Sequence, residues 1–152
     1  MLLLPTSPTL DEAAIAAAVD GLDARGATRQ AYVDGDGHRV CVNAVMVGED
    51  RRSSFSEAAA RRAATRGRRL LAVLGSGEAD GRLWIAYDMG STTSLAENGG
   101  RRLPTATCLR VLLDVARALD DAAADGFFAS ELPPSSVFIS RRGARLGDLG
   151  TA

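Results

Sequence analysis

Residues 126–152 are the stretch that most constrains what this chain can fold into. They read GFFASELPPSSVFISRRGARLGDLGTA. Two short apolar runs, at residues 137–139 and 144–146, flank Arg141-Arg142-Gly143, a pattern typical of a small β-hairpin. An acidic, proline-rich loop precedes this hairpin, and Asp148-Leu149-Gly150 follows it. The rest of the chain has to build a body that holds a loop, a hairpin and an acidic segment in that order.

A long helix is predicted immediately before this stretch, at residues 104–125. Pro104 suits the first turn of a helix, and Gly126 suits the position just after its last turn. Apolar residues lie around most of the cylinder, so this helix needs neighbours on most of its sides. They are Leu109, Val111, Leu112, Leu113, Val115 and Leu119.

Two further hairpins are predicted upstream of the long helix. The first joins residues 31–33 to residues 39–47 through Asp34-Gly35-Asp36-Gly37, and Asp-Gly between two apolar runs is a strong turn signal. The second joins residues 70–74 to residues 83–87 through a glycine-rich turn.

Two further helices are predicted at residues 11–22 and 51–66. Ser54 and Glu57 form a capping-box pattern at the start of the second one, and Gly67 is expected to end it. A polar linker and a short helical turn at residues 94–97 precede the long helix. Because strands and helices do not alternate regularly, the fold class is α+β rather than a parallel α/β fold.

Composition limits the kinds of partner. The chain has 152 residues and a formal net charge of −1, so no global field favours nucleic acid or a membrane surface. No apolar run approaches the roughly 20 residues of a membrane span. Every basic residue is arginine, and the sequence contains no lysine. We therefore expect a cytoplasmic protein with no nucleic-acid partner and no membrane span.

The order of these elements resembles the bacterial Ser/Thr protein kinases. Residues 79–86 look like the fifth strand entering the hinge, and residues 94–97 look like the helix after it. Residues 103–126 are similar to the long helix before the catalytic loop. Loop, hairpin and Asp148-Leu149-Gly150 resemble the catalytic and metal-binding segments.

The resemblance implies a kinase-like small lobe followed by the first part of the large lobe, ending after the Asp-Leu-Gly segment. It divides the chain into an N-terminal arm and helix at residues 1–21, a small lobe at residues 22–90, and a partial large lobe at residues 91–152.

The resemblance also places the nucleotide-binding positions of the small lobe. The three positions of the glycine-rich loop fall on Ala24, Gly26 and Arg29, so only Gly26 is a glycine. The position of the phosphate-pairing lysine falls on Asn43, which carries no charge. The glutamate that would pair with this lysine aligns with Ala58, next to Glu57.

The catalytic and metal-binding positions are altered as well. Glu131 keeps a carboxylate at the position of the catalytic base. Ser136 replaces the metal-binding asparagine, and Pro133 replaces a lysine that would contact the transferring phosphate. Asp148 matches the metal-binding aspartate and is the best-preserved position.

These departures argue against phosphoryl transfer, which depends mostly on positioned positive charge. We expect a catalytically inactive, truncated, pseudokinase-like module that acts by binding. One alternative is a residual ATP-binding, atypical kinase that relies on Glu131 and Asp148, with ATP and Mg²⁺ as the ligands implied by the resemblance. The other is a fragment or partial gene product of a longer kinase-like protein.

A kinase would continue with helices that cover the long helix at residues 104–125. Each leucine or valine left exposed there forgoes about 1.5–3 kcal/mol of burial. Three outcomes are open: residues 11–22 fold back as a cover, the apolar face binds a protein partner or forms a homodimer, or the chain is part of a longer protein.

Overall fold

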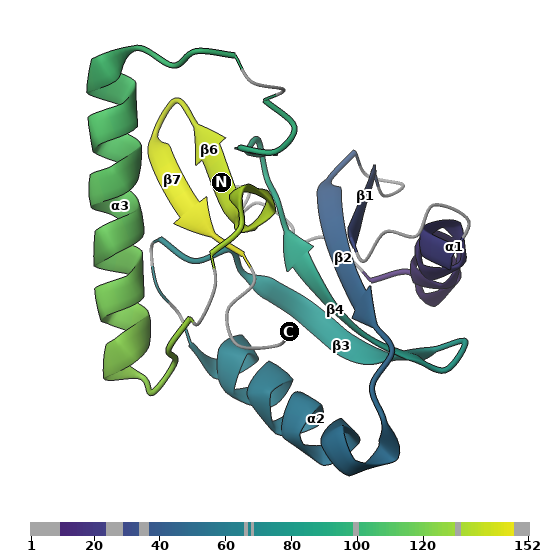
Figure 1. Ribbon diagram of the computed structural model, residues 1–152. Coiled ribbons are helices and arrows are strands. Elements are labelled where there is room, and N and C mark those ends of the chain that lie inside the picture. The colour runs from purple at the N-terminus through teal and green to yellow at the C-terminus, as the bar shows by residue number, and fades with distance from the viewer. Residues whose placement is uncertain are drawn as a thin grey trace, which may run out of the picture.

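The structure is a computed structural model that describes residues 10–23, 29–33, 37–65, 67, 69–98, 101–129 and 132–147. Its centre is a four-stranded antiparallel sheet in the order β1-β2-β4-β3 (Figure 1). The strands are β1 (Arg29–Val33), β2 (Arg39–Val45), β3 (Val73–Ala79) and β4 (Arg82–Asp88). The first predicted hairpin is confirmed, since Val33 at the end of β1 pairs with Arg39 at the start of β2.

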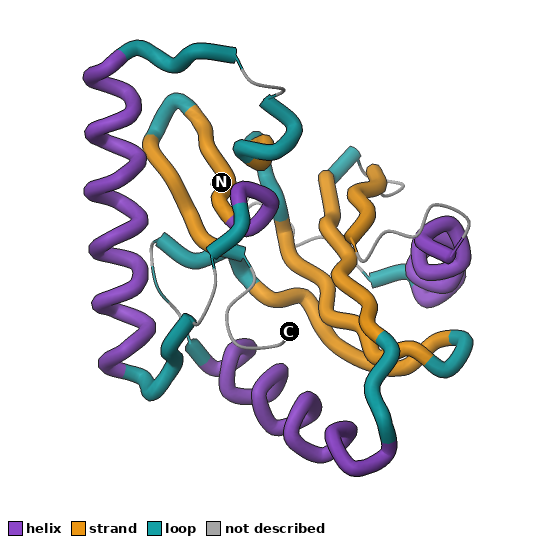
Figure 2. Tube along the Cα trace, viewed as in Figure 1, coloured by secondary structure: helices purple, strands orange, loops and turns teal. Residues whose placement is uncertain are grey.

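Each face of this sheet is covered by one helix (Figure 2). These helices are α1 (Glu12–Asp23) and α2 (Glu49–Ala64). Successive side chains of a strand point to opposite faces, so β2 contributes to both interfaces. Val40 and Val42 pack in the core cluster that contains α1, whereas Cys41 packs in the cluster that contains α2.

Helix α2 begins earlier than predicted. It starts at Glu49 with Gly48 as its N-cap residue, and its first turn carries Glu49 and Asp50. Two acidic side chains there suit the positive end of the helix dipole. Ser54 therefore lies inside the helix, and Glu57 is exposed on it. The predicted capping box is wrong, because the acids of the first turn define the start instead.

The second hairpin has a longer first strand than predicted. Strand β3 continues through the glycine-rich segment to Ala79, which pairs with Arg82. The turn is only Asp80-Gly81, with φ values of 51° and 76°. Positive φ at both central residues is what a two-residue hairpin turn requires. Leu70, at the start of the predicted strand, instead forms an isolated parallel bridge with Leu146.

A second, three-stranded sheet has the order β5-β6-β7. It comprises β5 (Thr93–Ser94), β6 (Val137–Ser140) and β7 (Gly143–Leu146). The predicted C-terminal hairpin is confirmed, with Ser140 opposite Gly143. Ser94 pairs with β6 as the last residue of a strand. The turn predicted at residues 94–97 follows it as a hydrogen-bonded turn at residues 95–98, in which the N–H of Glu97 donates to the Ser94 hydroxyl at 3.2 Å.

Helix α3 (Thr105–Ala124) confirms the predicted long helix. Pro104 is its N-cap residue, and Gly126 follows it with a φ of 83°. The helix is buried on the side that faces the β6–β7 hairpin, through Val111, Ala118 and Ala122. Helix α1 lies on the far side of the sheet from α3 (Figure 1). Of the three outcomes left open for the cover of α3, the one in which residues 11–22 fold back over this helix is therefore wrong.

No helix within the described ranges is long and apolar enough to cross a membrane.

Candidate functional site

Asn43 lies on the face of the sheet that carries α2. It sits on β2 opposite Ile85 of β4 and is 4% exposed. By strand alternation it shares its face with Cys41, which belongs to the α2 core cluster. The residue aligned with the phosphate-pairing lysine therefore occupies an inward position on the third strand of the resemblance. It offers a neutral amide there instead of a positive charge.

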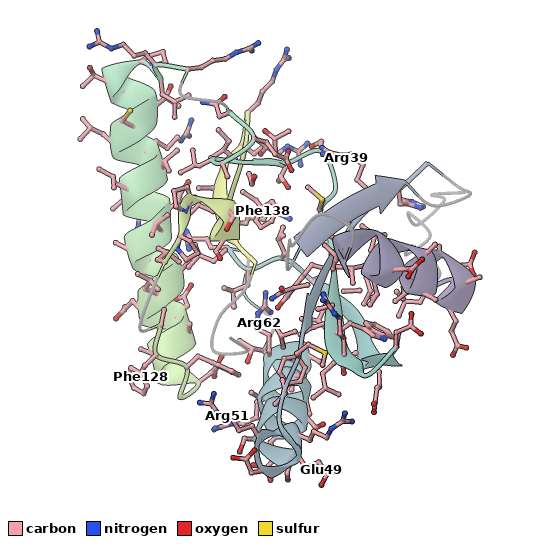
Figure 3. All side chains as sticks on the ribbon, turned by 45° about the vertical axis from the view of Figure 1, so that its right-hand side comes forward. Arg39, Glu49, Arg51, Arg62, Phe128 and Phe138 are labelled. Atoms are coloured by element: carbon pink, nitrogen blue, oxygen red, sulfur yellow. The ribbon has the colours of Figure 1, made fainter. Side chains whose placement is uncertain are left out.

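Arg62 is the buried cation of this region, and the sequence analysis missed it. It is 1% exposed and extends from the last turns of α2 toward the end of the C-terminal hairpin (Figure 3). Its Nη2 donates to the carbonyl of Leu71 at 2.6 Å and to that of Gly147 at 3.1 Å. Its Nε also donates to Gly147, at 3.3 Å, and its guanidinium carbon lies 5.4 Å from the centroid of the Tyr87 ring.

A signal for Arg62 was present in the sequence. Phe55, Ala59 and Arg62 lie four and then three residues apart, so they share one face of a helix. All three are the buried residues of α2. Arginines also occur in pairs at residues 51–52, 68–69, 101–102 and 141–142, so the sequence alone does not single out Arg62 as buried. Only the neighbour, Arg61, is exposed.

Ser136 lies next to the residue that precedes the Asp-Leu-Gly segment. It ends a short 3-10 turn, η1 (Pro134–Ser136), and is 2% exposed. The N–H of Gly147 donates to its carbonyl at 3.0 Å. The end of the loop that resembles the catalytic loop is thus hydrogen-bonded to Gly147. The predicted positions Gly26, Glu131 and Asp148 lie outside the described residues.

Backbone pairing joins the two sheets behind this site. The N–H of Leu71 donates to the carbonyl of Leu146 at 2.8 Å, and the N–H of Leu146 donates to the carbonyl of Arg69 at 2.8 Å. Phe138 of β6 is 2% exposed and belongs to the α2 core cluster. The C-terminal hairpin is therefore packed directly against the base of the small lobe.

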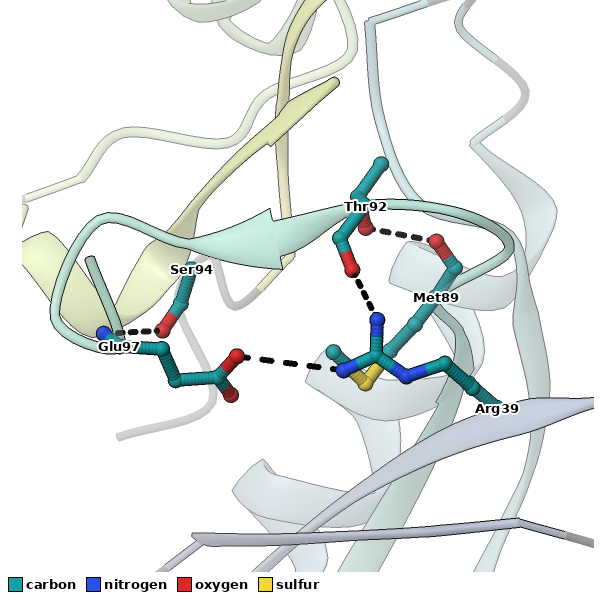
Figure 4. A network of polar contacts seen from close by, with 5 residues as sticks. All are labelled: Arg39, Met89, Thr92, Ser94 and Glu97. Atoms are coloured by element: carbon teal, nitrogen blue, oxygen red, sulfur yellow. Dashed lines mark hydrogen bonds and ion pairs between the residues drawn. The ribbon is translucent and has the colours of Figure 1, made fainter. Parts of the chain in front are cut away.

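A second set of contacts fixes the linker between the sheets (Figure 4). Arg39 of β2 donates from Nη1 to the carbonyl of Thr92 at 2.7 Å, and its Nη2 lies 3.9 Å from Oε2 of Glu97. The Thr92 hydroxyl donates to the carbonyl of Met89 at 2.6 Å. Arg39 thus holds the linker against the sheet at the N-terminal end of β2, whereas α2 follows the C-terminal end of this strand.

The described side chains fit a Mg²⁺–nucleotide site poorly. Asn43 is neutral, and Arg62 already donates to two main-chain carbonyls. Within the described residues, no three His, Cys, Asp or Glu side chains gather where they could hold a metal ion. Of the two predicted metal ligands, only Ser136 is described, and a neutral hydroxyl is a weaker ligand than a carboxylate.

Together these features define a protein kinase-like fold. A sheet with α2 across its inner face is followed by a linker, the long helix α3, a short loop and a hairpin packed back against the sheet. The resemblance stated from the sequence is confirmed at the level of fold, as a small lobe with part of a large lobe.

Solved structures give the particular similarities. The chain resembles the PknI kinase domain of Mycobacterium tuberculosis with a TM-score of 0.63 and 27% identity, over 75% of this chain and 49% of that domain. A doubly substituted form of this domain gives a TM-score of 0.64 at 24% identity, over 82% of this chain and 53% of that one. The chain thus spans about half the length of the kinase domains that it matches.

A similarity of fold extends to a pseudokinase. The Drosophila melanogaster PAN3 pseudokinase gives a TM-score of 0.61 at 12% identity, over 79% of this chain and 36% of that one. No protein-family model and no curated protein matches the sequence.

Proposed function

We propose that this chain is a catalytically inactive, pseudokinase-like binding or regulatory module of Ser/Thr kinase-type signalling in the cytoplasm. Asn43 carries the proposal. It is buried on the inward face of β2, at the position where the resemblance requires a lysine, and it brings no charge. Without fixed positive charge, the transition state of phosphoryl transfer loses its main source of stabilisation.

Arg62 supports this proposal because its guanidinium already donates to main-chain carbonyls. A guanidinium that donates to the carbonyls of Leu71 and Gly147 would have to give up those bonds to reach a phosphate. Buried carbonyls that lose their donors cost about 1–3 kcal/mol each. The cation of α2 therefore acts as part of the scaffold and does not replace the missing lysine.

The proposed division of the chain follows the resemblance: an arm and helix at residues 1–21, a small lobe at residues 22–90 and a partial large lobe at residues 91–152. The four-stranded sheet and α2 fall within the second part, which supports this division. Helix α1 runs to Asp23, two residues past the first boundary, and packs on the small-lobe sheet. The proposed binding surface is the exposed apolar face of α3, for a protein partner or a second copy.

Thermal denaturation with ATP, with and without Mg²⁺, tests nucleotide binding, and transfer of labelled phosphate tests catalysis. A dissociation constant of about 0.1 mM, measured at about 5 mM nucleotide, would add about 2.3 kcal/mol to the free energy of unfolding. For a chain of this size, that gain raises the melting temperature by roughly 5–9 °C. We expect a shift below about 1 °C, and no transfer of labelled phosphate to the chain or to a general protein substrate.

A matched variant decides the alternative. The residual ATP-binding, atypical kinase has support from the hydrogen bond between the N–H of Gly147 and the carbonyl of Ser136, which joins the end of the loop to the residue that precedes Asp148 in the sequence. A Mg²⁺-dependent stabilisation that disappears in Asp148→Asn would establish ATP binding, and transfer of labelled phosphate that disappears in the same variant would overturn the inactive module. A piece of a longer kinase-like protein is the other alternative, and the coverage of about half of the PknI domain favours testing it by sequencing the gene downstream.

A further inference from the structure

The outer face of α3 carries an apolar stripe. Leu109, Leu112 and Leu113 are 62%, 65% and 50% exposed, and Ala116 is exposed one turn further on. Residues spaced by three and four positions form one continuous face of a helix. Contiguous exposed apolar surface marks an interaction site more often than isolated residues do.

Charges are segregated along this helix. Exposed basic residues lie before the helix and in its first two thirds. Exposed acidic residues lie in its last two turns and directly after it. The exposed basic residues are Arg101, Arg102, Arg110 and Arg117, and the exposed acidic ones are Asp120, Asp121 and Asp125. Two acids of the helix have partners within the chain: Oδ2 of Asp114 accepts from the N–H of Ala144 at 3.0 Å, and Oδ2 of Asp121 lies 3.8 Å from Nη1 of Arg69. Asp120 therefore carries the argument for the acidic end.

We infer that a second copy of this chain covers the stripe, with the two α3 helices antiparallel; the inference rests on the proposed role as a binding module. A symmetric dimer places the same surface of each copy against the other. If the helices were parallel, arginine-rich ends would meet each other and so would the aspartates. The antiparallel arrangement sets the basic part of each helix beside the acidic end of its neighbour.

The register follows from the charges and the leucines together. When the two-fold axis crosses the outer face of α3 at the level of residue 115, Arg110 lies opposite Asp120 of the second copy, because residue 115 is midway between them in the sequence. Leu112 and Leu113 then lie within one helical turn of the axis on both copies. The apolar stripe is therefore buried at the centre, and the opposite charges flank it.

Sedimentation of the full chain over a concentration series tests this pairing. The wild type is expected at twice the 15.8 kDa chain mass. Leu112→Glu should weaken the dimer at least tenfold while leaving the circular dichroism spectrum unchanged, since the side chain is exposed. Met46→Glu is the control, because Met46 is 71% exposed but lies after β2, away from α3.

Charge exchange tests the orientation. Arg110→Asp and Asp120→Arg should each weaken the dimer, whereas the chain with both substitutions should regain it, because an antiparallel pair then restores opposite charges. A wild type that is monomeric at every concentration, a dimer that Leu112→Glu leaves intact, or a double variant as weak as the single ones would overturn the inference. A monomer that does not bind ATP would contradict the dimer but not the proposed function. A dimer that binds ATP and transfers phosphate would contradict the proposed function but not the dimer.

Discussion

At the scale of residues, Arg62 shows how one side chain can belong to two parts of a fold. It donates to Leu71, before the sheet strand β3, and to Gly147, after the C-terminal hairpin. The second partner is 85 residues away in the sequence. A guanidinium suits this role because its planar fork can donate in two directions at once, which a lysine ammonium does less well.

Replacement of Arg62 by methionine should destabilise the protein by about 2–4 kcal/mol, because two buried carbonyls lose a donor while the apolar stem is retained. Urea denaturation of both proteins measures the difference. Arg51→Met is the matched control on the same helix, since Arg51 is exposed (Figure 3) and its loss should change the free energy of unfolding by less than about 0.5 kcal/mol. Equal effects of the two substitutions would mean that the buried guanidinium does not tie the lobes together.

Sequence reasoning places Asn43 but not Arg62, for a physical reason. A strand alternates between two faces, so the side of an inward position follows from its neighbours in the sequence. Burial of an arginine depends on which acceptors surround it in space, and these come from Leu71 and Gly147. The spacing of Phe55, Ala59 and Arg62 indicates a shared face, but it does not reveal what that face contacts.

At the scale of elements, the small-lobe sheet is enclosed by α1 and α2. Trp84, the one tryptophan of the sequence, faces α1 and shares a core cluster with Ile15. Phe55 of α2 packs against the opposite face. Tryptophan emission therefore reports on one helix–sheet interface and not on the other.

Ile15→Ala should cost about 2–5 kcal/mol and change the emission of Trp84 in the folded protein, because the cavity forms beside the indole. Phe55→Ala should cost a similar 3–5 kcal/mol and leave the emission of the folded state unchanged, because its cavity lies across the sheet. Fluorescence spectra recorded before and during urea denaturation separate the two effects. If Phe55→Ala changed the emission of Trp84 and Ile15→Ala did not, the placement of α1 and α2 on opposite faces of the sheet would be contradicted.

A helix or strand is predictable from the sequence where its apolar spacing and the residues at its two ends indicate the same element. Helix α3 has regular apolar spacing, a proline at its start and a glycine after its end, and its prediction is confirmed. The start of α2 was missed because Ser54 and Glu57 match a capping pattern inside a longer helix. The pairing of β5 with β6 joins Ser94 to Phe138, and no local pattern in a two-residue strand indicates such a partner.

At the scale of the whole molecule, the two lobes share one core. Phe138 of the hairpin lies in the same cluster as Phe55 and Tyr87 of the small lobe. Backbone bonds between Leu71 and Leu146 run alongside it. Two parts that share buried side chains cannot unfold separately without exposing them.

Urea unfolding should therefore occur in a single transition. The emission of Trp84 follows the small-lobe sheet, and far-UV circular dichroism is dominated by helices, of which α3 belongs to the other lobe. We expect the two signals to give the same midpoint. A fluorescence transition at lower urea than the dichroism transition would show that the lobes unfold independently.

The sequence predicts that α3 needs a cover on most of its sides, but it leaves open whether residues 11–22 supply this cover. In the structure they do not, and Leu109, Leu112 and Leu113 are exposed. Helix α1 could pack against either of two apolar surfaces, the sheet or α3, and in the structure it packs against the sheet. Composition does not resolve this choice, because both surfaces accept the same alanine-rich helix.

The hydrogen bonds between Arg62 and Gly147 have a consequence for folding during synthesis, because the two residues are 85 positions apart. Ribosomes add about 5–20 residues per second, and domains begin to fold as they emerge. Helix α2 and its sheet leave the ribosome while Phe138 and Gly147, which complete their core, are still untranslated. For several seconds the inner face of the sheet is thus open to solvent, and a nascent chain in this state is a substrate for chaperones. The β6–β7 hairpin, which is synthesised after the sheet and α2, is thus the element that closes their core.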